Sequence, residues 1–206
     1  MNVTSPKNHS LARRAVLGAL LVGASATALV ACAPENPEIK NDGSGKGFIA
    51  GDGSVSLYEG EDRSDPVSFT AKTFDDTTID SSTWTAPVTV LNFWYAACAP
   101  CRTEAPTLKK LSDKFAAQKV QFVGVNIRDE KAAAEAFDRT FGLTYPSIRD
   151  VGDSGVLQAL SSYVPPQAVP TTLVLDKDRR VVARILGVAD ESVLNSIITD
   201  TLAESK

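Results

Sequence analysis

Two cysteines separated by two residues, Cys98-Ala99-Pro100-Cys101, have the types and spacing best suited to chemistry in this sequence. Thiols at this spacing can close a small disulfide when the first one begins a helix, whose free N–H groups and dipole lower the thiol pKa. Pro100 fits an early helical position because its missing N–H has no intrahelical partner there. A bridge that closes so short a loop adds little stability. The pair therefore indicates a redox-active disulfide rather than an inert structural one.

The third cysteine, Cys32, follows a segment that has the parts of a secretory signal peptide. Residues 1–31 contain three basic residues, Lys7, Arg13 and Arg14, no acid, and an apolar stretch that ends in small residues. The strongly apolar part spans about 8 residues, whereas a transmembrane helix needs ~20. We therefore expect export with processing, and a permanent membrane span is the alternative. The adjacent arginines leave both Sec and twin-arginine export open.

The sequence Leu29-Val30-Ala31-Cys32 resembles the bacterial lipoprotein box, in which the cysteine is acylated and becomes the new N-terminus. The alternative is an incidental cysteine near a cleavage site. Each buried CH₂ of an acyl chain contributes ~0.8 kcal/mol, so several chains anchor a protein stably in a membrane. The polar residues 33–47, rich in Gly and Pro, are typical of a flexible linker.

These features predict a chain in three parts. They are a signal peptide, a lipid-anchor cysteine with its flexible linker, and a folded domain, at residues 1–31, 32–47 and 48–206. About 160 residues are enough for one domain with a hydrophobic core. We expect this domain at the outer face of the cytoplasmic membrane, held there by a lipid anchor at Cys32.

The composition of the predicted domain excludes several classes of function. Three of the 21 Lys and Arg residues lie in residues 1–31, so 18 remain against 25 acidic residues, a net charge of −7. This acidity argues against nucleic acid as a partner and against electrostatic docking on anionic lipid. The only His and Met residues, His9 and Met1, also lie in that segment. A Cys-His or Ser-His-Asp unit, a His-ligated metal and a His/Met-ligated haem are therefore excluded, and we expect no cofactor and no metal.

The elements that must position the cysteines alternate in type. Apolar runs and helical periodicity predict strands at 88–95 and 120–126 and helices at 99–118 and 130–141. The first strand leads directly to Cys98, and the alternation of strand and helix implies a parallel βαβ unit.

The remaining elements complete an α/β domain. They are a helical turn at 155–160, a hairpin of strands 171–175 and 180–186, a final amphipathic helix at 192–202, and an N-terminal β extension within 48–84. The order βαβα–ββα, with Cys-x-x-Cys at the first strand-to-helix junction, is the thioredoxin arrangement. The predicted fold class is therefore the α/β thioredoxin fold, with a mixed central sheet flanked by helices.

Two segments carry a closer resemblance to a known family. Residues 92–106, Asn-Phe-Trp-Tyr-Ala-Ala-Cys-Ala-Pro-Cys-Arg-Thr-Glu-Ala-Pro, and the later Val169-Pro170-Thr171-Thr172 resemble the TlpA/ResA/CcmG-like thioredoxins. The similarity runs over roughly residues 65–204. It implies a membrane-tethered, extracytoplasmic thiol–disulfide oxidoreductase. It also implies two kinds of partner: disulfide-bearing exported proteins, with apocytochrome c suspected, and a membrane electron donor of thiol–disulfide type.

Cys98 is the expected nucleophile and Cys101 the resolving thiol. A thiolate at Cys98 attacks a disulfide sulfur and forms a mixed disulfide, which Cys101 resolves by closing the Cys98–Cys101 disulfide. We expect Cys98 to be exposed at the helix start and Cys101, one turn further inward, to be the less accessible of the two.

Glu104 lies three residues after Cys101, on the same face of the predicted helix. A carboxyl held near a buried thiol can relay its proton and, while ionised, raise thiol pKa values. The family resemblance implies the same role. The alternative is a solvated glutamate that complements the helix dipole. Many thioredoxins instead carry a buried Asp on the preceding strand, where this chain has Asn92, which cannot titrate.

Pro170 resembles the cis-proline of the loop that faces the disulfide in this family. A cis bond there would present the backbone of Val169 to an extended substrate chain; the alternative is an ordinary trans proline at a strand start. Trp94 is expected to pack beside the disulfide and contribute to substrate binding, with a plain core aromatic as the alternative. Ala97 departs from the family, which often has Trp before the first cysteine, and leaves substrate preference open.

Three functions compete for this site. The first is a disulfide reductase in cytochrome c maturation, and the second is an oxidant or isomerase for folding exported proteins. Strongly oxidising relatives usually place His beside the second cysteine, which favours the first. The third, a redox-inactive module that binds unfolded chains, is disfavoured by the two intact cysteines. A peroxidase is excluded because Tyr95 stands where such sites need Thr or Ser.

Overall fold

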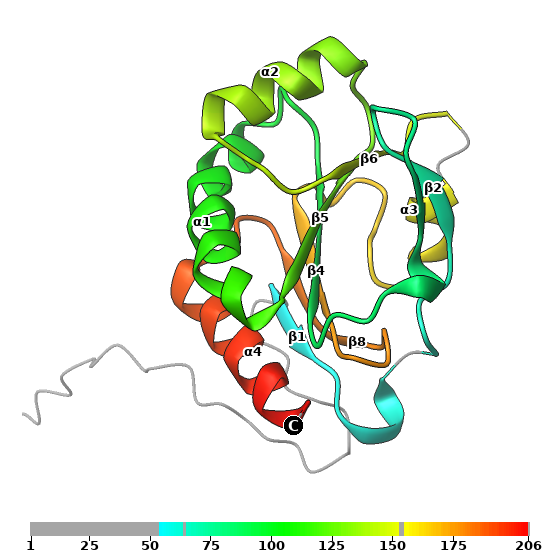
Figure 1. The fold of residues 1–206 in the computed structure, drawn as a ribbon, viewed down its shortest axis with the longest axis vertical. Coiled ribbons are helices and arrows are strands. Elements are labelled where there is room, and N and C mark those ends of the chain that lie inside the picture. Colours follow the sequence, from blue (N-terminus) through cyan, green and yellow to red (C-terminus); the bar gives the residue numbers. More distant parts are fainter. Residues whose placement is uncertain (1–53, 64, 153–154, 206) are drawn as a thin grey trace, which may run out of the picture. The chain divides into compact units, whose positions relative to one another are not determined.

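The computed structural model describes residues 54–63, 65–152 and 155–205 (Figure 1). The predicted signal peptide, the lipid-anchor cysteine Cys32 and the linker therefore lie outside the described residues. Within them, no helix combines the length and the apolar character that a membrane crossing requires.

A six-stranded mixed sheet forms the centre, in the order β1-β8-β7-β4-β5-β6. Its strands are β1 (Val55–Leu57), β4 (Thr89–Trp94), β5 (Gln121–Asn126), β6 (Ser147–Arg149), β7 (Thr171–Leu175) and β8 (Val181–Leu186). Strands β4, β5 and β6 run parallel, whereas β7 is antiparallel to both β4 and β8, and β1 is antiparallel to β8. Every residue of β4 and β7 is buried, which explains their nearly continuous apolar sequences.

Two layers cover the faces of the sheet (Figure 1). The helices are α1 (Ala99–Phe115), α2 (Lys131–Phe141), α3 (Gly155–Ala159) and α4 (Glu191–Glu204). Helices α1 and α4 pack on one face, where Leu108 and Ile198 meet Val90 of β4 in one apolar cluster. Leu91, the next residue of β4, points to the opposite face and joins a second cluster with Val156 of α3. This alternation of side chains along a strand separates the two halves of the core.

The N-terminal extension contributes to both the sheet and the second layer. Strand β1 joins the edge of the main sheet, where Val55 pairs with Ile185 of β8. Strands β2 (Thr70–Lys72) and β3 (Thr78–Asp80) form a separate antiparallel hairpin. Short 3₁₀ turns lie at Gly60–Asp62, Ser81–Thr83 and Ala116–Gln118 among the described residues.

The predicted fold class is confirmed, most predicted strands and helices match the observed bounds within two residues, and two elements differ by more. The helix predicted to reach residue 118 ends as an α-helix at Phe115 and continues as the 3₁₀ turn 116–118. Strand β6 was not predicted, because three residues, Ser-Ile-Arg, are too short to show a periodic pattern. Its pairing with β5 places it at the edge of the sheet.

Candidate redox site

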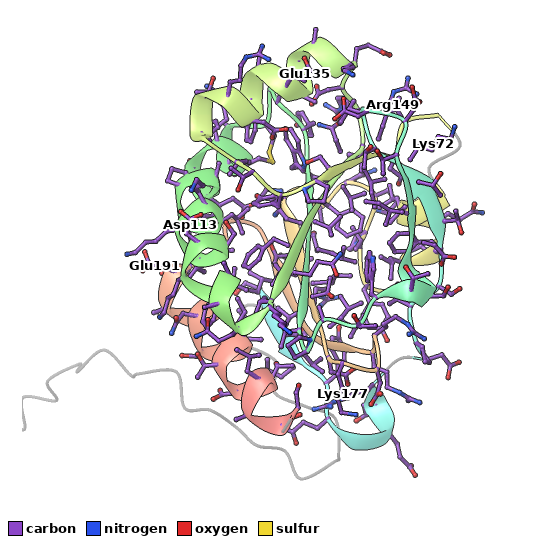
Figure 2. All side chains as sticks on the ribbon, viewed as in Figure 1. Lys72, Asp113, Glu135, Arg149, Lys177 and Glu191 are labelled. Carbon is purple, nitrogen blue, oxygen red and sulfur yellow. A yellow bond between two sulfur atoms is a disulfide. The ribbon has the colours of Figure 1, made fainter. Side chains whose placement is uncertain are left out.

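The first turn of α1 carries the cysteine pair as a closed disulfide. The sulfur atoms of Cys98 and Cys101 lie 2.01 Å apart, and Figure 2 draws this bond in yellow. Cys98 is the N-cap residue of α1, and its sulfur accepts a hydrogen bond from the Cys101 N–H at 3.1 Å. Pro100 occupies the first turn, as its missing N–H allows. The start of the helix therefore offers the Cys98 sulfur an N–H donor that would stabilise a thiolate after reduction.

Both cysteines are buried, which corrects one prediction. Cys98 was expected to be exposed and Cys101 less accessible, but each residue is only 2% exposed. The Val169 carbonyl oxygen lies 3.9 Å from the Cys98 sulfur. This contact is not a hydrogen bond, because a disulfide sulfur has no proton to donate. The two cysteines also pack against Trp94 and Phe137, which shield them from solvent. Contacts from elements distant in the sequence thus bury a residue that its local sequence places at an open helix end.

The loop that faces the disulfide has the predicted geometry. The Val169–Pro170 peptide bond is cis. The Pro170 carbonyl accepts a hydrogen bond from Gly187 N–H at 2.8 Å, and the Thr171 hydroxyl donates to the Ala168 carbonyl. These bonds hold the loop against the start of β7 and the end of β8. The proposed presentation of the Val169 backbone to a substrate chain stays a prediction.

Trp94 packs beside the disulfide, in one apolar cluster with both cysteines. Its ring lies 4.3 Å from that of Phe137, centroid to centroid. A Cβ atom at Gly124 would come within 2.8 Å of the Trp94 indole nitrogen and 2.3 Å of the Ser147 hydroxyl, so glycine is needed beneath the ring. Because Trp94 is buried, its predicted contact with substrate stays a prediction.

Glu104 is buried in the middle of the fold and bound by two other elements. It is 1% exposed. The Asn92 side-chain amide of β4 donates to one carboxyl oxygen at 2.7 Å, and the Ala189 N–H donates to the other at 2.9 Å. Burial raises the pKa of Glu104 to about 7, although both hydrogen bonds act in the opposite direction. The alternative of a solvated, dipole-complementing glutamate is therefore wrong.

The loop from Tyr95 to Ala97 is fixed by Asp129, which the sequence did not single out. The Ala96 N–H donates to the Asp129 carboxylate at 2.5 Å, and the Asn126 amide donates to the same oxygen at 2.7 Å. Asp129 follows β5, so only the pairing of β5 with β4 brings it to this loop. A residue whose role depends on strand pairing leaves no local sequence signal.

A disulfide at a helix start, opposite a cis-proline on this sheet, defines a thioredoxin-fold thiol–disulfide oxidoreductase. The family model named Redoxin matches residues 62–198, more than half of the chain. The thiol–disulfide oxidoreductase ResA of Bacillus subtilis is 31% identical over 69% of this chain and 75% of its own length. The chain therefore belongs to the redoxin family, with ResA-like relatives.

Two solved structures are similar over most of their length. A DsbF homologue from Corynebacterium diphtheriae is 32% identical, with a TM-score of 0.65 over 73% of this chain and 94% of that one. A secreted thiol-disulfide isomerase from Corynebacterium glutamicum is 29% identical, with a TM-score of 0.67 over 76% of this chain and 97% of that one.

The roles of the two cysteines can be separated by substitution. With equal burial, the N-cap position and its N–H donor still favour Cys98 as the nucleophile. Cys101→Ser should therefore trap a mixed disulfide with a model disulfide peptide, whereas Cys98→Ser should abolish exchange. Non-reducing electrophoresis and mass spectrometry detect the adduct. An adduct formed by Cys98→Ser and not by Cys101→Ser would reverse the two roles.

Glu104 should make the stability of the oxidised protein depend on pH. Its pKa is about 7 in the folded protein against an ordinary value of 4.5, so its protonated form stabilises the fold. This contribution is complete below about pH 4.5 and is lost as the pH rises to about 7, by roughly 3 kcal/mol. Glu104→Gln should remove that part of the pH dependence, measured by urea unfolding from pH 4 to 8.

Glu191→Gln is the matched control, because Glu191 lies at the surface of α4 (Figure 2). This variant should follow the wild-type curve. Glu104→Gln should also shift the pH profile of thiol–disulfide exchange, a readout that a purely structural role would leave in place. Parallel stability curves for Glu104→Gln and wild type would refute the raised pKa.

Proposed function

We propose that this protein is an extracytoplasmic disulfide reductase that acts in cytochrome c maturation. The observation that carries the proposal is the buried Glu104, one helical turn after Cys101. A strong oxidant such as DsbA owes its potential to a stabilised reduced form, in which the thiolate is favoured. A carboxylate beside the cysteines disfavours the thiolate and so favours disulfide formation in the protein, which is the property of a reductase.

In the proposed reaction two electrons pass from the cysteine pair to a client disulfide. The Cys98 thiolate attacks one client sulfur, and the other client sulfur leaves as a thiolate and takes a proton from water. The Cys101 thiol then gives its proton to the Glu104 carboxylate, and its sulfur attacks Cys98 and releases the second client thiolate. The second client thiolate takes the proton back from Glu104, so the client is left as a dithiol, the protein as the Cys98–Cys101 disulfide and Glu104 again as a carboxylate. A membrane dithiol donor would then reduce this disulfide.

A second candidate is an oxidant or isomerase for exported proteins. It is favoured by the name of the secreted thiol-disulfide isomerase from Corynebacterium glutamicum, 29% identical to this chain. An isomerase must act in both directions, so it needs a less reducing cysteine pair than a reductase does. The reduction potential therefore separates the two candidates.

The reduction potential of the cysteine pair should lie near or below about −270 mV, the thioredoxin value. Equilibration in defined dithiothreitol buffers, followed by alkylation of free thiols and mass spectrometry, measures it. Glu104→Gln should move the potential upward, because the uncharged amide no longer disfavours the thiolates. A wild-type value towards about −120 mV, where strong oxidants lie, would reject the reductase and support the second candidate.

We also propose that the domain 48–206 is anchored by acylation of Cys32 after removal of residues 1–31. The lipoprotein-like sequence before Cys32 supports this, and the linker 32–47 would hold the domain near the outer membrane face. In a bacterial host, the wild type should incorporate labelled palmitate and fractionate with membranes. Cys32→Ser should lose the label and leave the membrane, and Cys101→Ser is the control. A Cys32→Ser protein that stays membrane-bound would favour a permanent span.

A further inference from the structure

Two arginines flank the loop Tyr95–Ala97 that leads to Cys98. The Arg102 guanidinium lies over Phe141, 5.1 Å from the ring centroid, and its Nη1 donates to the Ala96 carbonyl at 3.4 Å. Arg102 directly follows the cysteine pair in the sequence, and its side chain reaches back to the loop that precedes the pair.

Arg128 approaches the same loop from the end of β5. Its guanidinium lies 4.0 Å from the centroid of the Tyr95 ring, and the Tyr95 carbonyl accepts the Cys98 N–H at 3.1 Å. Both guanidinium groups thus contact residues of the loop, and the loop is itself hydrogen-bonded to Cys98. Stacking on aromatic rings restricts each guanidinium while its edge keeps N–H donors available.

Neither guanidinium is paired with a carboxylate in the part of the chain that the structure describes. The neighbouring acids are engaged elsewhere. Asp129 accepts the hydrogen bonds of Ala96 and Asn126, and Glu130 lies 3.5 Å from Arg149. The two side chains are exposed, so a carboxylate from another molecule could reach their donors.

We propose that Arg102 and Arg128 form an anion-binding rim that selects client segments with carboxylates beside the cysteine. The proposal deepens the proposed function and rests on it for the exchange reaction. The chain outside residues 1–31 has a net charge of −7, so most of its surface repels an acidic client. A cationic rim beside the buried disulfide attracts the client to the site itself, and this orients the client sulfur towards Cys98.

The test compares two disulfide-bridged peptides that differ only in the residues beside their cysteines, glutamate in one and lysine in the other. The rate constant for reduction by the reduced full-length protein is measured for each. At low salt the glutamate peptide should react about tenfold faster, within the usual range of electrostatic steering. At about 0.5 M salt this preference should fall below about twofold, because the screening length becomes shorter than 10 Å.

The double variant R102Q/R128Q should lower the glutamate-to-lysine ratio to about one at low salt. Because both peptides are tested on the same variant, a general loss of activity cancels in this ratio. The control is K114Q/K177Q, which removes the same charge. Lys114 lies 5.2 Å from the Phe115 ring centroid near the end of α1. Lys177 lies at the end of the described domain opposite α2 (Figures 1 and 2). This control should keep the wild-type ratio.

A wild-type preference for the lysine peptide would mean that net charge dominates, and it would overturn the proposal. An unchanged ratio in R102Q/R128Q would overturn it too. If the protein proves to be an oxidant, the same peptides are supplied as dithiols, and the same preference is expected. If the reductase assignment fails, the direction of exchange changes and the glutamate preference remains. If the rim proposal fails, the glutamate preference is absent or does not depend on the two arginines.

Discussion

A carboxyl buried in the middle of a fold can form hydrogen bonds only with other protein groups, and the Glu104 carboxyl accepts them from two other elements. Its helix, α1, is thereby tied to strand β4 through Asn92 and to the start of α4 through Ala189. Asn92 also donates to the Thr172 hydroxyl of β7, which follows the cis-proline. The group proposed to handle the proton is thus part of the network that holds the helix of the cysteines against the loop facing them. A change at Glu104 must alter the chemistry and the geometry of the site together.

Parallel pairing of β4 with β5 sets the other side of the site. It places Asn126 and Asp129 at the end of β4, where Asp129 fixes the backbone of Ala96. Parallel strands end at the same edge of a sheet, so loops from separate βα units meet there and can hold one short segment rigidly. The loop before Cys98 is therefore constrained by hydrogen bonds to the Ala96 backbone and by the Cys98 N–H bond to the Tyr95 carbonyl, although Ala97 itself contributes only a small side chain.

The sequence predicted those parts of the molecule that depend on local pattern. Strand β7 matches its predicted bounds, and Cys98 begins a helix as the Cys-x-x-Cys spacing indicated. The cis bond at Pro170 came from a family resemblance rather than from local physics. The burial of Cys98 and the role of Asp129 could not be predicted, because both depend on elements brought together by strand pairing. Strand β6 was missed because three residues on a sheet edge carry almost no pattern.

Burial of both sulfur atoms has a consequence for selectivity. A client cannot be recognised by contact with the disulfide alone, since each cysteine is 2% exposed and Val169 lies over the Cys98 sulfur. Discrimination among clients therefore has to come from groups around the disulfide, and the groups proposed for it are the backbone of Val169 and the guanidinium groups on either side of the Tyr95–Ala97 loop. Backbone contacts read an extended chain without regard to its sequence. Under the proposal that Arg102 and Arg128 bind client carboxylates, charge is the property that distinguishes one extended chain from another.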